Sequence, residues 1–92
     1  MLQGKWISTD LADTIEFSDN KDLYKMINGF RDHYDYSLSG NMITIAYNGI
    51  CFILVVPSTH SIELERDLLT IDFSEPCFGF RQQVITFKRN AE

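Results

Sequence analysis

The residues best suited to chemistry in this chain are its two histidines and the polar side chains beside them. His33 and Asp35 are two residues apart, so on a β-strand they share one face and could ligate a metal together. Two local ligands are too few for a metal site, and we expect an exposed polar pair. His60 follows Ser58, but no G-x-S-x-G motif accompanies them. We therefore expect no metal, no cofactor and no enzymatic activity.

The two cysteines, Cys51 and Cys77, lie 26 positions apart and lack C-x-x-C spacing. The common zinc and redox motifs are therefore absent from the sequence. Two separate buried thiols are the favoured interpretation. A disulfide, formed in an oxidising compartment, is the alternative.

Charge and composition limit the classes of partner. The 92 residues predict one domain, and 45% hydrophobic residues are enough to build a core. The net charge is -5 and the basic residues are scattered, so we expect neither nucleic acid nor a membrane surface as a partner. The sequence begins without the apolar segment of a signal peptide, which predicts a soluble protein. Its compartment stays unknown, because a processed secreted or periplasmic form is equally compatible with this sequence.

The hydrophobic pattern predicts β-strands. Apolar and polar residues alternate over runs such as 14–18, 34–38 and 43–47, the period of strands with one face in the core. Turn signals recur about every ten residues, which is typical of all-β sandwiches and barrels. Among them, Asn48-Gly49 lies between two apolar runs and predicts a type I′ hairpin turn with positive φ at both residues.

The strands that this pattern predicts close into a barrel. They lie near residues 3–9, 13–18, 22–28, 32–38, 41–47, 50–57, 60–66, 67–74 and 79–89. If residues 50–66 form one strand bent at Pro57, the chain has eight strands instead of nine, and antiparallel closure needs an even number of strands. We therefore predict an all-β fold, an antiparallel up-and-down meander of about eight strands forming a small barrel over residues 1–92.

Short motifs at the two ends of the chain indicate a family. Gly4-Lys5-Trp6 opens the first predicted strand and Phe87-Lys88-Arg89 ends the last. With the meander between them, the chain resembles the lipocalin/calycin superfamily, in particular the small bacterial lipocalin-like proteins. In that family a G-x-W motif opens the first strand, and an arginine of the last strand packs over the tryptophan. The resemblance implies that Arg89 stacks on Trp6 and caps the closed end of the barrel.

The other end of the barrel is the expected ligand site. If the alternation of the last strand continues back from Arg89, Arg81 faces the lumen; a bulge near Gly79 would turn it to water instead. Five residues make up the candidate ligand-binding site: Tyr34, Tyr36, Tyr47, Arg81 and Gln83. Large inward rings leave little space in a small barrel, so we expect a narrow, shallow pocket there. Arg81 would meet a polar or anionic end of the ligand.

Two functions are compatible with these observations. The first is a binding module for a small apolar or amphipathic ligand at the barrel mouth. The alternative is a filled barrel that acts as a protein-interaction or structural module without a small-molecule ligand. Residues 50–56 are apolar on both faces, and the row of Cys51, Ile53 and Val55 predicts a homodimer contact.

Overall fold

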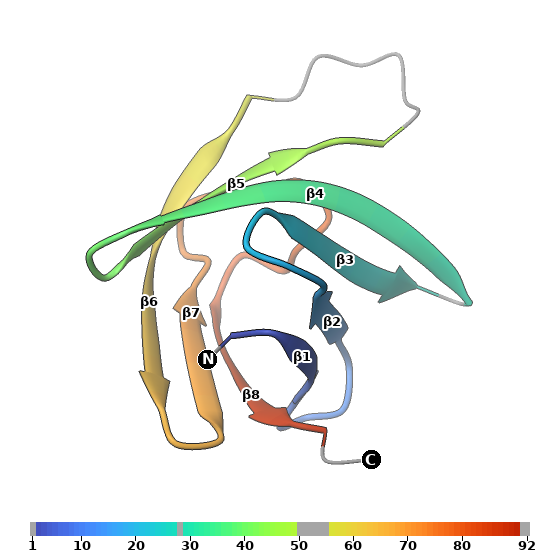
Figure 1. Cartoon of the computed structure of the whole chain (residues 1–92), viewed down its shortest axis with the longest axis vertical. Helices are drawn as coiled ribbons and strands as arrows, with labels where there is room; N and C mark the ends of the chain where they lie inside the picture. Colours follow the sequence, from blue (N-terminus) through green and yellow to red (C-terminus); the bar gives the residue numbers. More distant parts are fainter. Residues whose placement is uncertain (1, 28, 50–55, 91–92) are drawn as a thin grey trace.

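A computed structural model of the chain describes residues 2–27, 29–49 and 56–90 (Figure 1). Within these residues the chain forms β-strands and no helix. The strands are β1 (Gly4–Ser8), β2 (Thr14–Phe17), β3 (Asp22–Ile27), β4 (Phe30–Ser39), β5 (Met42–Tyr47), β6 (Ser58–Glu65), β7 (Leu68–Asp72) and β8 (Val84–Arg89). The described part of the chain contains no helix that is long and apolar enough to span a membrane.

The strands form a closed barrel in sequence order. Each strand pairs antiparallel with the next, and β8 pairs back with β1, so the predicted all-β meander is confirmed. Because the chain runs up and down, the connections after β1, β3, β5 and β7 lie at one end, which we call the loop end. The turns after β2, β4 and β6 lie at the other end, together with residues 2–3, and we call it the hairpin end.

The alternating pattern correctly identifies the residues that fill the lumen. Deeply buried apolar side chains come from every strand except β6 and from the residue after β7: Trp6, Ile15, Phe17, Leu23, Tyr34, Ile43, Leu69, Ile71, Phe73 and Phe87. The buried residue that β6 contributes is His60. The apolar rings and branched chains meet in the middle of the barrel, because successive side chains of a strand point to opposite faces. Of the aromatic residues predicted to face inward, Trp6, Phe17, Tyr34, Phe73 and Phe87 therefore pack the centre of the fold.

Two predictions about strand ends are wrong. The last strand begins at Val84 and not near residue 79, because Gly79 has φ of +86° and the segment before β8 makes turn hydrogen bonds to itself, such as Phe80 N–H to Cys77 C=O. Neither Asn48 nor Gly49 has positive φ. These two residues begin the long connection between β5 and β6 and do not form a two-residue hairpin turn.

The predicted strand over residues 50–57 is tested only at its end. Val56 and Pro57 lie outside the strands, and β6 begins directly after them at Ser58. Residues 50–55 lie outside the described residues, and so does the predicted dimer contact through Cys51, Ile53 and Val55. Cys77 carries a free, buried thiol, in agreement with separate thiols, and its burial raises the pKa of that thiol.

Candidate functional site

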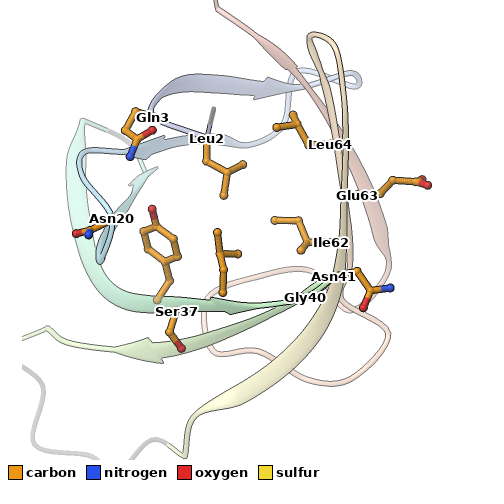
Figure 2. Close-up of a pocket in the computed structure, with 11 residues that line it drawn as sticks. Leu2, Gln3, Asn20, Ser37, Gly40, Asn41, Ile62, Glu63 and Leu64 are labelled. Carbon is orange, nitrogen blue, oxygen red and sulfur yellow. The ribbon is translucent and has the colours of Figure 1, made fainter.

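An open pocket of about 720 Å³ lies in the barrel at the hairpin end (Figure 2). Residues of β4, β6 and the adjoining turns line it, together with the chain that leads into β1: Leu2, Gln3, Asn20, Tyr36, Ser37, Leu38, Gly40, Asn41, Ile62, Glu63 and Leu64. Its place at the ends of the strands leaves it accessible from solvent.

The walls of the pocket are apolar. Leu2, Ile62 and Leu64 point into the opening, whereas Glu63 points away from it (Figure 2). Leu38 and Leu64 line the pocket although they are 51% and 41% exposed. Each of these exposed leucine side chains offers apolar area that a bound apolar group would cover. Removing that area from water is favourable by roughly 25 cal/mol for each Å².

Tyr36 contributes its ring to the pocket and uses its hydroxyl within the protein. The hydroxyl donates a hydrogen bond to the main-chain carbonyl of Asp19, 2.6 Å away. The ring packs edge-to-face on Phe17, with the two centroids 4.9 Å apart. Burial raises the pKa of this phenol, so it stays neutral at physiological pH.

The rim of the pocket is polar but nearly uncharged. Gln3, Asn20 and Asn41 carry side-chain amides, which can donate as well as accept hydrogen bonds. Lys and Arg are absent from the described lining residues, and Glu63 is turned outward. The pocket therefore suits a neutral ligand better than an anion.

The Trp6–Arg89 pair holds the segment that forms one wall of the pocket. The guanidinium of Arg89 lies over the Trp6 ring, 4.3 Å from its centroid, which confirms the predicted stacking. The Trp6 indole N–H donates to the carbonyl of Leu2 at 2.9 Å, and Arg89 Nη1 donates to the carbonyl of Gln3 at 2.9 Å. Gly4 has φ of +121°, and a Cβ there would lie 3.2 Å from Arg89 Nη1.

This arrangement places an opening at the end of the barrel that was expected to be closed. The pocket opens at the end that carries the Trp6–Arg89 pair, so the expectation that this pair caps the closed end is wrong. The physical reason lies in the connections. The turns after β4 and β6 are two residues long and cannot cover the lumen, whereas the long connection after β7 packs over the opposite end.

At the loop end, Tyr34 lies under that long connection. Its hydroxyl donates to the carbonyl of Phe78 at 3.1 Å, and its ring lies 5.3 Å from both the Tyr47 and the Phe80 rings. Gly79 passes so close that a Cβ added there would clash with the Tyr34 hydroxyl oxygen. Burial raises the pKa of Tyr34. Tyr34 therefore belongs to the packed core beneath this connection, and the pocket lined by Leu2, Tyr36 and Ile62 lies at the opposite end of the barrel.

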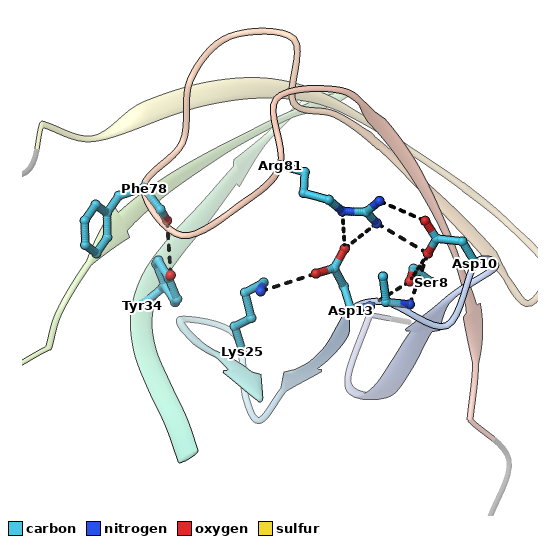
Figure 3. A network of polar contacts seen from close by, with 8 residues as sticks. Ser8, Asp10, Asp13, Lys25, Tyr34, Phe78 and Arg81 are labelled. Carbon is cyan, nitrogen blue, oxygen red and sulfur yellow. Dashed lines mark hydrogen bonds and ion pairs between the residues drawn. The ribbon is translucent and has the colours of Figure 1, made fainter. Parts of the chain in front are cut away.

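Arg81 is engaged in ion pairs beside the same connection (Figure 3). Its Nε donates to Asp13 at 3.0 Å and its Nη1 to Asp10 at 2.8 Å. Asp13 also pairs with Lys25, with 3.3 Å between Nζ and Oδ1. The Arg81 hydrogen bonds hold the pKa of Asp10 well below its usual range. The charge of Arg81 is thus balanced by carboxylates of the protein.

The structure does not bring the five predicted site residues together. Tyr36 lines the pocket at the hairpin end, Tyr34 and Tyr47 pack at the loop end, and Gln83 is exposed just before β8. The residues that sequence reasoning did not select are the apolar wall residues Leu2, Leu38, Ile62 and Leu64. The alternation of β4 and β6 marks the last three as inward-facing, but it does not show which end of the barrel is open.

The comparisons with known proteins add no relative. No protein-family model, no curated protein and no solved structure matches the chain significantly.

Proposed function

We propose that the chain is a small lipocalin-like binding module that takes a neutral, mainly apolar small molecule into the hairpin-end pocket. The observation that carries this proposal is the open apolar pocket itself. Its volume of about 720 Å³ lies within the range of roughly 300–1,000 Å³ that is usual for small-molecule sites. A filled barrel without a ligand would not need such a hollow.

The chemistry of the walls supports the class of ligand. Leu38, Ile62, Leu64 and the Tyr36 ring offer an apolar surface, and the amides of Gln3 and Asn20 stand at its edge. Burial of apolar area supplies the affinity, and a few placed polar groups fix the orientation of a ligand. An amphipathic molecule with an uncharged polar end matches this order of surfaces.

Two features support the lipocalin-like assignment. The chain closes eight antiparallel strands into a barrel, and the arginine of the last strand stacks on the tryptophan of Gly4-x-Trp6. We also propose that the module is not an enzyme. The ionisable groups among the lining residues are Tyr36 and Glu63, and the first donates to Asp19 while the second points out of the pocket.

The test is a fluorescence titration with N-phenyl-1-naphthylamine, a neutral apolar probe. We expect saturable binding that is tighter than the binding of a naphthoic acid of similar size. Leu64→Gln should weaken probe affinity about tenfold, because a polar group replaces an apolar wall of the site. Leu68→Gln is the matched control: Leu68 is also exposed, 47% against 41% for Leu64, but it does not line the pocket.

The outcomes separate the two functions named from the sequence. Equal weakening in both variants, or no saturable binding by the wild type, would contradict the ligand-binding proposal. The filled-barrel alternative, a protein-interaction module, would then be favoured. Tighter binding of the acid than of the neutral probe would contradict the proposed ligand class.

A further inference from the structure

The outer face of the barrel carries a cluster of metal-ligating side chains, remote from the pocket. Asp22 of β3 and Asp35 of β4 are directly opposite each other in the sheet, and His33 stands next to Asp35 on the same face. The Nε2 atom of His33 lies 2.8 Å from Asp22 Oδ1 and 3.8 Å from Asp35 Oδ1. All three ligand atoms lie within 4.8 Å of one another. Pairing of the strands thus adds a third ligand to the two that are close in sequence.

We propose that Asp22, His33 and Asp35 bind a divalent transition-metal ion, with Zn²⁺ the best-suited ion. In a tetrahedral zinc site with bonds of about 2.1 Å, neighbouring ligand atoms are about 3.4 Å apart. The separations of the two carboxylate oxygens from Nε2 lie on either side of that value. Three protein ligands leave the fourth position to water, and the imidazole favours zinc, copper or nickel over magnesium or calcium.

Neighbouring residues hold the ligands in place. The His33 ring stacks on Tyr24 with 4.9 Å between centroids and 19° between planes, and the Arg31 guanidinium also lies over Tyr24. Asn48 donates from Nδ2 to both carboxylate oxygens of Asp35, at 3.2 and 3.1 Å. Such outer partners orient the ligands of metal sites. All three ligands stand on paired strands, so little ordering is needed when a metal binds.

The charge of the cluster favours a cation. Two carboxylates face one imidazole, and in the described part of the chain neither Asp22 nor Asp35 forms an ion pair with a lysine or arginine. The guanidinium of Arg31, which lies over the Tyr24 ring, pairs instead with Glu16 at 3.3 Å. A bound metal ion would take the place of the proton between His33 Nε2 and Asp22, and it would compensate both carboxylates. This imidazole distinguishes the cluster from an ordinary acidic surface patch.

Calorimetric titration of the purified protein with ZnCl₂ tests the proposal. The wild type should bind one zinc ion per chain. His33→Gln and Asp22→Asn should each weaken binding at least about tenfold. Glu63→Gln should stay within about twofold of the wild type, since it removes an outward carboxylate on β6 that the cluster does not use. Far-UV circular dichroism of each variant checks that the barrel is retained.

A second measurement reports the ligands directly. Cobalt(II) bound to the wild type should give the visible absorption bands of a tetrahedral ion, and His33→Gln should abolish them. Zinc binding by His33→Gln with wild-type affinity would overturn the proposal, because the metal would then be held elsewhere, for example by a thiol. An equal loss in Glu63→Gln, or no saturable zinc binding by the wild type, would overturn it as well.

Discussion

The Arg89 guanidinium lies 4.3 Å from the centroid of the Trp6 indole, and each of the two side chains donates a hydrogen bond to the chain just before β1. Because Leu2 and Gln3 form one wall of the pocket, this pair links the closure of the barrel to the shape of the site. A residue pair at the seam between the first and last strands therefore also positions binding residues.

Arg89→Ala should destabilise the barrel by about 1–2 kcal/mol, because it removes the stacking and the packed stem of the side chain. It should also weaken probe binding at the hairpin end, since the main-chain carbonyl of Gln3 loses the hydrogen bond that Arg89 donates. Urea unfolding and the fluorescence titration measure the two effects. Lys88→Ala is the matched control, since Lys88 is exposed on the same strand. A loss of stability as large in Lys88→Ala would contradict this role of Arg89.

Gly79→Ala should cost more stability than Gly29→Ala. Both glycines have nearly the same positive φ, +86° and +84°, so alanine is strained to a similar degree at either place. Only at Gly79 does the added Cβ meet another group, the Tyr34 hydroxyl. We expect about 1 kcal/mol for Gly29→Ala and about 1–3 kcal/mol more for Gly79→Ala. Equal losses in urea unfolding would show that the connection does not press on Tyr34.

Asp13→Asn should destabilise the loop end by about 3–5 kcal/mol, because it leaves the buried Lys25 ammonium without its carboxylate. Asp13 and Lys25 are 6% and 7% exposed, and Asp13 pairs with Arg81 as well. Asp10→Asn removes an exposed partner of the same arginine and should cost clearly less. Thermal unfolding measures the loss of stability in each of the two variants. A larger loss in Asp10→Asn would contradict the proposed importance of the buried pair.

The stability of the protein should fall as pH drops from about 7 to 5, in part through His60. This imidazole is 2% exposed, bonds Ser58 Oγ through Nε2 at 2.7 Å, and has its pKa lowered by burial. The unfolded chain takes up a proton below pH 6.5 that the folded chain resists, so the free energy of unfolding decreases there.

Replacing His60 with Asn should make the free energy of unfolding less dependent on pH over this window. The carboxylates whose pKa is lowered, those of Asp10, Asp19 and Asp72, act at more acidic pH. Urea unfolding at pH 7, 6 and 5 measures the slope for both proteins. If the free energy of unfolding depends on pH equally in His60→Asn and in the wild type, then His60 is not the cause of this pH dependence.

The sequence was sufficient for the architecture and insufficient for the location of the site. Period-two alternation identifies Tyr36, Ile43 and Ile71 as inward-facing, because burial of one strand face is a local property. The open end of the barrel depends on the path of long connections. β8 begins only at Val84, so the alternation carried back from Arg89 stops before it reaches Arg81, and the alternative in which Arg81 faces the lumen does not apply. Strand register, which the sequence leaves open, is what brings Asp22 next to His33.

The most direct test of the account is to locate a bound apolar probe by NMR. Methyl-labelled protein titrated with N-phenyl-1-naphthylamine should shift the methyl signals at the hairpin end, those of Leu2, Leu38, Ile62 and Leu64. Signals from residues near Tyr34 and Arg81 should not move. Shifts centred on the loop end, or no shifts at a saturating probe concentration, would contradict the central claim that the hairpin-end pocket is the binding site.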